Sequence, residues 1–468
     1  MRLIIRDGTI VVPTGRFRAD LLCDDGRITS INERGTSGAG GAQVDAGGLL
    51  VFPGFIDPHV HSRDPGLTYK EDFDHLSRAA AAGGVTTVLE MPNAVPPISS
   101  VDVLEARAAD FGTRSLVDFG LWAISLGREN LAEVPRLLER GAVGIKLFWG
   151  YSTKKDTREL VYNPSPEMDV LPPPTSEDVI DLFDSVAHVG GLLAAHCEDS
   201  GLINAGLKKL GRPISSYADI PEVRSDAAES ASVALGIEYA RASGCSFHVV
   251  HTSAARSIEL IRRAQREGVK VTAETCPHYL TFVASDYRHV GPAMKVFPPI
   301  KNGDDRDALR AALRDGTISS VGSDHAPHTD EEKHRGLAEA PAGAPGVETL
   351  SRVMLDLAHQ GHLTYEQLAW LLSEGTARLY GLHPKKGAIN PGADADLTLV
   401  DPEARWTIRG ADLHSKSHVT PWEGLSGYGV PVMSFLRGHD VMREGEPTTE
   451  PVGRFIAPGI VNRSRTDS

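Results

Sequence analysis

The chain has 468 residues, of which 41% are hydrophobic and 24% are charged, and its formal net charge at pH 7 is -14. This length predicts one large core with a smaller module beside it. The acidic balance excludes a general affinity for nucleic acid or for an anionic membrane, because both need clustered Lys and Arg.

The cysteines and the N-terminus favour a cytoplasmic protein. The four cysteines are scattered without a CxxC pair, so neither a disulfide framework nor a thiolate zinc site is expected. The first apolar run is too short and too polar for a signal peptide. No run approaches the roughly 20 apolar residues of a membrane span.

The first 48 residues predict a small β module. Short runs rich in β-branched residues follow one another, and we interpret Asp7-Gly8 and Asp25-Gly26 as the turns between them. The stretch GTSGAGGA, residues 35–42, predicts a flexible loop because it offers nothing to bury.

Residues 49–384 alternate strand and helix patterns. Apolar runs such as VTTVLEM, GLLAAHC and VKVTAET are separated by amphipathic runs such as EDFDHLSRAAAAG. Seven or eight such units predict an α/β fold whose parallel sheet closes into a (β/α)8 TIM-like barrel. An open doubly wound sheet is the alternative, but no GxGxxG follows an early strand. A capping box, Thr364 with Gln367, begins the last helix of this region.

Strand patterns return after the barrel region. The stretches GAINPGADADLTLVD and GVPVMSFLRGHDVMREG resemble the beginning of the chain in their strand-like residue pattern. Residues 1–48 and 385–445 are therefore predicted to pair in one composite β-sandwich that flanks the barrel. Residues 446–468 are expected to be a C-terminal tail.

Ionisable residues stand in or at the ends of most predicted barrel strands. A single histidine at a strand end is more often a packing residue than a ligand. A whole set at successive strand ends would converge on the barrel axis, where barrel enzymes build their sites. Such a set offers the nitrogen and oxygen ligands that zinc takes. Its members are His59, His61, Lys146, His196, His251 and Asp324.

Lys146 needs a separate explanation because it lies inside the apolar strand AVGIKLF. A buried ammonium group is costly, and metal cations beside it would repel it. Carboxylation of the amine would turn it into a carboxylate that can bridge two metals. The alternative is an ordinary lysine that pairs with an acid such as Glu90.

Five motifs together resemble the cyclic amidohydrolases of the amidohydrolase superfamily, which comprise dihydroorotases, hydantoinases or dihydropyrimidinases, and allantoinases. The motifs are PGFIDPHVHSRDPG, GIKLF, AHCED, HVVHTS and GSDHAPHT. The resemblance covers nearly the whole chain. It implies a distorted (β/α)8 barrel with a flanking β-sandwich, two zinc ions, a small cyclic amide as substrate, and a homodimer or homotetramer.

The resemblance also implies a role for each member of the strand-end set. His59, His61 and Asp324 would bind the more buried zinc, His196 and His251 the other, and carboxylated Lys146 would bridge both. Two zinc ions sharing one water lower its pKa to about 7, which yields a bridging hydroxide able to attack the ring amide. Asp324 would then carry the proton to the leaving nitrogen.

Three residues favour a dihydroorotase-like substrate that carries a carboxylate. Arg63, Asn93 and His328 match the groups with which dihydroorotases hold that carboxylate, and an arginine fork suits it through two parallel hydrogen bonds. The alternative for Arg63 is a surface salt bridge with Asp64 or Glu71.

Other residues point to hydantoinases or allantoinases. Tyr151 stands five residues after the strand lysine, as in hydantoinases, where that phenol stabilises the oxyanion. Phe297 replaces the Asn that dihydroorotases carry before PPLR, and Ala342 replaces a substrate-binding Asn of hydantoinases. Phe297 and Trp149 either pack in the core or face a bulkier ring substituent. The insertion of residues 152–174 is a candidate lid.

Two further classes remain as alternatives. A non-catalytic scaffold relative would not need all six ligand positions, which are filled here. A mononuclear deaminase of the same superfamily is disfavoured by the lysine in GIKLF and by the absence of an HxxE motif after the fifth strand.

Overall fold

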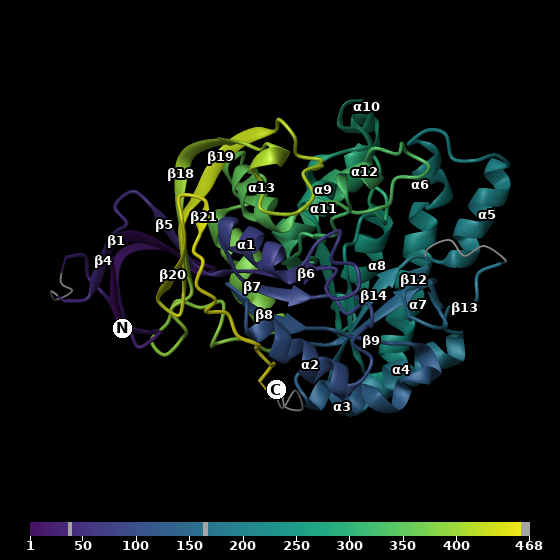
Figure 1. Ribbon diagram of the computed structural model, residues 1–468, viewed down its shortest axis with the longest axis horizontal. Coiled ribbons are helices and arrows are strands. Elements are labelled where there is room, and N and C mark those ends of the chain that lie inside the picture. The colour runs from purple at the N-terminus through teal and green to yellow at the C-terminus, as the bar shows by residue number, and fades with distance from the viewer. Residues whose placement is uncertain (36–39, 162–166, 460–468) are drawn as a thin grey trace.

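The computed structural model describes residues 1–35, 40–161 and 167–459, and it has a mixed α/β fold. Figure 1 shows a sheet built from both ends of the chain on one side, beside a larger body of parallel strands flanked by helices. The predicted loop 35–42, lid 152–174 and tail 446–468 lie partly outside the described residues.

The two ends of the chain meet in one nine-stranded sheet. Its order is β21-β20-β19-β18-β5-β1-β2-β3, and β4 also pairs with β1. β5 joins the two ends, because it pairs in parallel with β1 and antiparallel with β18. The strands are β1 Arg2–Val12, β2 Gly15–Asp24, β3 Arg27–Asn32, β4 Ala42–Asp45, β5 Leu50–Pro53, β18 Leu397–Thr407, β19 Ser426–Leu436, β20 His439–Arg443 and β21 Glu446–Pro447.

Two details of this sheet differ from the sequence interpretation. Asp7-Gly8 does not form a turn: β1 runs through it, and the register to β2 shifts between Ile5 and Gly8. This β-bulge places Asp7 at φ 57°, a conformation that Asp tolerates better than most residues. The sheet also continues past residue 445, because β21 begins at Glu446.

The parallel strands form two hydrogen-bonded arcs, β6-β7-β8 and β9-β10-β14-β15-β16-β17. Only Trp122 separates β8 from β9, and one parallel bridge from Val60 to His325 links the first arc to the segment after β17. This order is consistent with the predicted barrel, although no continuous ladder closes it in the described residues. The strands are β6 Phe55–Val60, β7 Val85–Glu90, β8 Asp118–Leu121, β9 Ala123–Ile124, β10 Ile145–Trp149, β14 Leu192–Cys197, β15 Ser246–Val249, β16 Val271–Thr275 and β17 Ser320–Val321.

Helices flank these strands and bury one apolar face against them. The capping box at Thr364 and Gln367 is present, but the helix that it begins is interrupted by a π-helical turn, Trp370–Glu374. The helices are α1 Phe73–Ala82, α2 Val101–Gly112, α3 Val134–Glu139, α4 Ser176–His188, α5 Ser200–Leu210, α6 Asp219–Val223, α7 Asp226–Ser243, α8 Ala255–Arg266, α9 Pro277–Thr281, α10 Tyr287–Val290, α11 Gly303–Asp315, α12 Asp330–Lys333, α13 Val347–His359, α14 Tyr365–Ala369 and α15 Gly375–Leu379.

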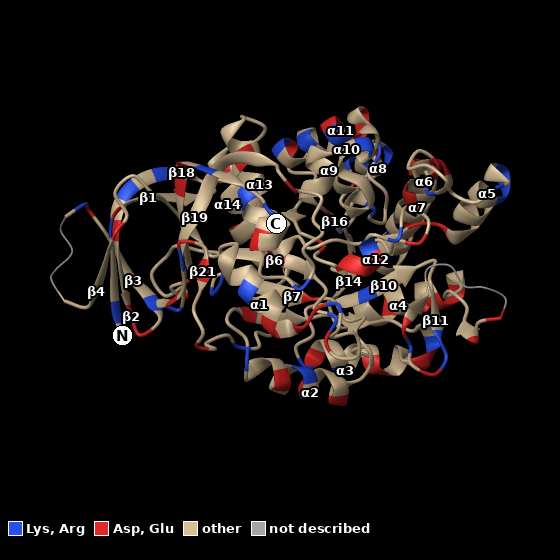
Figure 2. Cartoon of the chain, turned by 45° about the horizontal axis from the view of Figure 1, so that its top comes forward, with Lys and Arg blue, Asp and Glu red and all other residues tan. Residues whose placement is uncertain are grey.

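The predicted lid region is an excursion from the parallel strands. Its described part contains β11 Ser152–Lys154, β12 Leu160–Val161 and β13 Val170–Leu171, which pair in a small antiparallel sheet. Figure 2 shows Arg interspersed with Asp on helix α11. Within the described ranges, no helix has the length and apolar character needed to span a membrane.

Candidate metal centre

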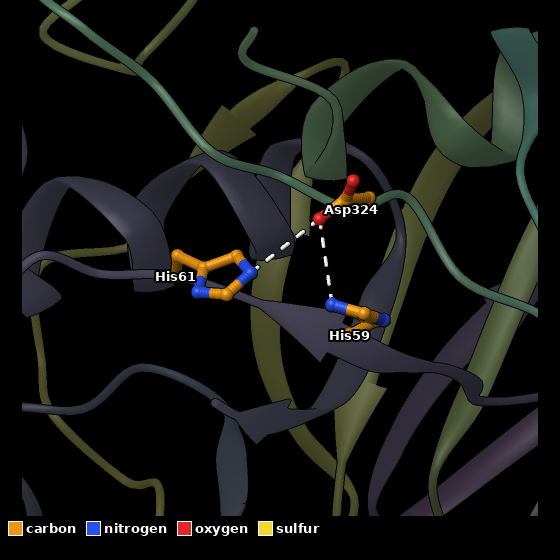
Figure 3. Close-up of side chains that lie close together, drawn as sticks. All are labelled: His59, His61 and Asp324. Atoms are coloured by element: carbon orange, nitrogen blue, oxygen red, sulfur yellow. Dashed lines mark ion pairs between the residues drawn. The ribbon is translucent and has the colours of Figure 1, made fainter. Parts of the chain in front are cut away.

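Two histidines and an aspartate meet where β6 and β17 end. His59 lies in β6 and His61 follows it, so both project from the same face of the strand. Their Nε2 atoms each lie 3.4 Å from Oδ1 of Asp324, three residues beyond β17. Figure 3 shows both imidazoles pointing toward this carboxylate. Two imidazole nitrogens converging on one carboxylate oxygen form a candidate metal site.

A second pair of histidines adjoins this site. Nδ1 of His196, in β14, lies 3.0 Å from Nε2 of His251, which follows β15. The ring of His251 is 5.3 Å from that of His59, so the four imidazoles form one continuous group. Nδ1 of His251 has no hydrogen-bond partner within the described part of the chain.

Lys146 is fully buried in β10, and its Nζ has no hydrogen-bond partner among the described residues. Burial lowers the pKa of this amine to about 8, so the neutral form that reacts with carbon dioxide is accessible near neutral pH. The alternative partner Glu90 is engaged elsewhere, because its carboxylate accepts hydrogen bonds from the backbone and hydroxyl of Ser62. A buried amine without a partner fits carboxylation and metal binding better than a structural ion pair.

Burial also keeps the imidazoles in the form that binds metals. It lowers the pKa of His61 to about 4 and that of His251 well below its usual value, so both rings are neutral at pH 7. A neutral ring nitrogen is the state required of a metal ligand. Burial opposes the ionisation of Asp324, but the neighbouring His59 and His61 outweigh it and hold its pKa well below the usual range. The donor set therefore fits a divalent cation such as zinc.

Three of the predicted site residues have unusual backbone conformations. Arg63, His251 and Asp324 have φ values of 63°, 38° and 50°, in the left-handed region that non-glycine residues rarely occupy. Such strain concentrates at functional sites, where surrounding contacts hold it in place. The backbone at Gly322 also passes very close to His59, because a Cβ on Gly322 would lie 2.9 Å from Cβ of His59. Only glycine allows this segment to lie so near the histidine.

Two carboxylates orient the histidines, and the sequence reasoning did not assign them. Oε1 of Glu274 lies 2.8 Å from Nδ1 of His59, and Oε2 of Glu198 lies 2.8 Å from Nε2 of His196. Each carboxylate fixes which ring nitrogen faces the centre, as outer partners of metal ligands do. Glu274 stands in the apolar run VKVTAET and Glu198 in the motif AHCED, so their position at strand ends was the available signal.

Arg63 lies beside the candidate metal-binding histidines in a buried position. Its Nε donates to the carbonyl of Pro327 at 3.2 Å, and its side chain lines the same pocket as His59 and His61. The surface salt bridge considered for it is not present. Asp64 instead pairs with Arg114 at 2.8 Å, and Glu71 accepts hydrogen bonds from Ser415 and Lys416.

All ten predicted site residues except Asn93 and His328 line this pocket, which we call the reaction pocket. Oδ1 of Asn93 lies 2.7 Å from Nδ1 of His61. Nδ1 of His328 lies 3.1 Å from Nζ of Lys70 and accepts from it, so the ring proton sits on Nε2 and faces the carbonyl of Ala342 at 3.0 Å. Nε2 also lies 3.3 Å from Nη2 of Arg63. Asn93 and His328 thus contact residues that line the reaction pocket but do not line it themselves.

Aromatic residues form another wall of the reaction pocket. Oη of Tyr151 lies 2.8 Å from Nε2 of His196, and Phe297 and Ala342 line the pocket as well. Trp149 instead packs against Tyr239, with the rings stacked at 6.1 Å, which agrees with its interpretation as a packing residue. Arg224 was not predicted from the sequence, and the central carbon of its guanidinium lies 3.8 Å from the centre of the Phe297 ring.

Comparisons with known proteins agree with this geometry. Residues 50–441 match the family described as the amidohydrolase family. An allantoinase of Streptomyces avermitilis is 34% identical over 98% of this chain and 99% of its own. A dihydroorotase of Geobacter sp. strain M21 is 34% identical over 95% of this chain and its whole length. An L-hydantoinase of Paenarthrobacter aurescens is 31% identical over 97% of both chains.

Solved structures show the same fold. The L-hydantoinase (dihydropyrimidinase) from Arthrobacter aurescens superposes with a TM-score of 0.90 at 29% identity, covering 97% of this chain and 99% of that one. A D-hydantoinase structure superposes with a TM-score of 0.88 at 27% identity, covering 98% and 99%. Relatives with three different named activities thus match this chain at similar levels of identity.

Proposed function

The chain belongs to the amidohydrolase family, in its group of dihydroorotases, allantoinases and hydantoinases, and from this membership we propose that it opens a cyclic amide that carries a carboxylate, as dihydroorotate does. That the protein is an amidohydrolase of cyclic amides follows from the family. The carboxylated ring is the proposal, and the position of Arg63 carries it.

The proposal includes two zinc ions. His59, His61 and Asp324 would hold one, His196 and His251 the other, and carboxylated Lys146 would contribute to both sites. The unpartnered Nζ of Lys146 and Nδ1 of His251 support this assignment, because buried polar atoms without partners are uncommon in proteins. When bound, the two ions supply an acidified water as the nucleophile and polarise the amide carbonyl.

Asp324 and Tyr151 would provide the remaining chemistry. An amide nitrogen is a poor leaving group unless it receives a proton, and Asp324 lies at the metal histidines, where it can take a proton from the nucleophile and pass it on. The Tyr151 phenol faces the same pocket, where its O–H can donate to the oxygen that becomes negative as the ring amide is attacked.

Arg63 would bind the ring carboxylate. A buried guanidinium needs an anionic partner or several acceptors, and neither Asp64 nor Glu71 serves Arg63 here. Its fork lies beside the metal histidines, so a substrate carboxylate could meet it through two parallel hydrogen bonds. Asn93 lies behind His61 and its amide nitrogen would be the second contact.

A neutral ring of the hydantoin, dihydropyrimidine or allantoin type is the second candidate. It is favoured by Tyr151, which lines the pocket, and by Phe297, which offers no hydrogen bond where dihydroorotases carry Asn. The allantoinase and L-hydantoinase relatives match this chain about as well as the dihydroorotase does. A non-catalytic role is disfavoured, because the described ligand set retains every donor that a metal centre needs.

The proposal extends to the fold and the assembly. The strand order and the TM-score of 0.90 to a hydantoinase support a (β/α)8 barrel at residues 49–384 beside a composite β domain from residues 1–48 and 385–445. A homodimer or homotetramer is proposed from the family resemblance alone.

A panel of four rings tests the substrate. The zinc-loaded protein is incubated separately with dihydroorotate, hydantoin, dihydrouracil and allantoin, and ring opening is followed by loss of ring absorbance. Dihydroorotate should give the highest kcat/KM. Arg63→Met should lower that value by about 10- to 100-fold, because hydrogen bonds to a charged group contribute roughly 1.5–3 kcal/mol.

The control variant is Arg140→Met, which removes an exposed arginine paired with Glu105 far from the pocket. It should leave kcat/KM unchanged. Preference for a neutral ring that is unaffected by Arg63→Met would overturn the carboxylate proposal and favour the second candidate.

A further inference from the structure

Arg224 is a buried arginine at the wall of the reaction pocket with three defined neighbours. It follows α6, in the excursion between β14 and α7, and only 3% of it is exposed. Its Nη2 lies 2.8 Å from Oη of Tyr151 and 3.1 Å from Oε2 of Glu198. A buried guanidinium costs free energy unless it is paired, so these contacts hold it in one place.

The direction of the hydrogen bonds follows from the chemistry of the groups. A guanidinium only donates, so the Tyr151 oxygen accepts from Arg224 and its own proton must be donated elsewhere. In this structure the phenol donates to Oε2 of Glu198 at 3.5 Å, and its oxygen also lies 2.8 Å from Nε2 of His196. A lone pair engaged by a cation makes the phenol O–H a stronger and better directed donor.

Phe297 completes this arrangement. The centre of its ring lies 3.8 Å from Cζ of Arg224, within the range of a cation–π contact. One face of the ring is therefore covered by Arg224, which also contacts Tyr151. Dihydroorotases carry a hydrogen-bonding Asn at the position of Phe297. In this protein the aromatic ring at that position instead packs against the Arg224 guanidinium.

We propose that Arg224 is a positioning residue that aims the Tyr151 hydroxyl into the reaction pocket and strengthens it as a hydrogen-bond donor, with Phe297 holding the guanidinium in place. The inference rests on the proposed role of Tyr151 in ring opening. Arg224 itself acts through the phenol, and Glu198 balances its charge while orienting His196.

A double-mutant cycle tests whether Arg224 acts through Tyr151. With the ring that the parent protein opens fastest, Arg224→Met should lower kcat by about 10- to 100-fold, with KM changed less than about 3-fold and the zinc content retained. Tyr151→Phe should cost as much or more. Combining the two should add little to the loss of Tyr151→Phe alone, because both remove the same interaction.

Two variants separate positioning from a structural role. Arg224→Lys keeps a cation within reach of the phenol and should recover part of the lost kcat. Arg212→Gln is the matched control: Arg212 lies in the same excursion, is half-exposed and pairs with Asp219 at 2.7 Å. It should leave kcat and KM unchanged. Additive losses in the cycle would show that Arg224 acts independently of Tyr151 and would overturn the inference.

A measurement without substrate keeps the inference testable if none of the rings is opened. With 3-fluorotyrosine at position 151, the fluorine NMR resonance reports the surroundings of the phenol. Arg224→Met should displace or broaden it, Phe297→Leu should do so to a smaller degree, and Arg212→Gln should not. An unchanged resonance in Arg224→Met overturns the inference. An inactive parent with a displaced resonance would instead contradict the proposed function alone.

Discussion

Lys146 is the residue whose chemistry the surrounding structure constrains most. Its amine is fully buried at the reaction pocket, which the four imidazoles and Asp324 also line, and its Nζ has no hydrogen-bond partner in the described residues. A carboxylated amine would carry negative charge toward two cations, whereas a free ammonium would repel them. We therefore expect Lys146→Ala to lose most of its zinc and at least about 10³-fold in kcat, since residues that act as one unit cost nearly the full effect when removed singly.

Two measurements check this prediction. Native mass spectrometry of the parent protein should show one carboxyl adduct and two zinc ions, and both should disappear or decrease in Lys146→Ala. Lys154→Ala, which removes a partly exposed lysine of β11 paired with Glu159, should change neither. A parent protein that keeps two zinc ions without any adduct would contradict the bridging role.

The grouping of the candidate metal ligands could be predicted from the sequence because its signal is local. His59 and His61 share a strand face, and each of the other ligands follows or lies within a recognisable apolar run. Glu274 was visible at a strand end but unassigned, since its partner His59 is 215 residues away. Arg224 had no such signal: its role depends on Tyr151 and Phe297, which only the tertiary fold brings to it.

Among the elements, the segment between α12 and α13 forms part of the reaction pocket and is fastened by two buried lysines. Nζ of Lys333 donates to the carbonyls of Pro341 and Gly343 at 3.0 and 2.8 Å. Nζ of Lys295 donates to the carbonyls of Leu337 and Ala340 at 2.7 and 2.6 Å. Backbone carbonyls without strand or helix partners are thereby satisfied, which fixes the loop that carries Ala342 and Gly343.

Lys333 should make stability depend on pH. Burial, and then the charge of Lys295, lower its pKa from 10.5 to about 7. Between these values the unfolded chain holds a proton that the folded protein lacks, so stability increases as the pH rises from about 7 toward 10. Lys333→Met should reduce this slope by up to about 1.4 kcal/mol per pH unit, measured by urea unfolding at pH 7 to 9.5.

The control for this prediction is Lys209→Met, which removes an exposed lysine from the last turn of α5. It should leave the slope as it is in the parent protein. Equal slopes in the parent and in Lys333→Met would mean that Lys333 stays charged in the fold.

Strands and helices could be predicted where the sequence shows one clear hydrophobic pattern. Local details such as turns, bulges and helix irregularities were less predictable, because they depend on tertiary packing. The apolar runs became strands β6 to β10 and β14 to β17, because buried parallel strands read as continuous apolar stretches. Asp7-Gly8 has the composition of a turn, but pairing of β1 with β2 on both sides keeps it as a bulge. The π-helical turn at Trp370–Glu374 has no sequence signature comparable to the capping box that precedes it.

At the scale of the whole molecule, a buried ionic cluster joins the parallel strands to the sheet built from the chain ends. Nζ of Lys386 lies 2.5 Å from Asp118, 2.9 Å from Asp394 and 2.6 Å from Asp396. Asp118 begins β8, whereas Asp396 immediately precedes β18. Arg437, which follows β19, also pairs with Asp118 and donates its backbone N–H to Asp396. One lysine thus neutralises carboxylates from two sheets.

Removing Lys386 should weaken the contact between the two sheets and leave the reaction pocket intact. Lys386→Met would leave three buried carboxylates facing each other, and breaking a buried ion pair from one side typically costs about 3–5 kcal/mol. The free energy of unfolding from urea titration should fall by that amount, while Lys385→Met, an exposed neighbour, should have no effect. Zinc content should persist under native conditions, because the side-chain ion pairs of Lys386 join it to Asp118, Asp394 and Asp396 and to none of the six candidate ligands at the reaction pocket. A parent-like unfolding curve for Lys386→Met would show that the cluster does not hold the two sheets together.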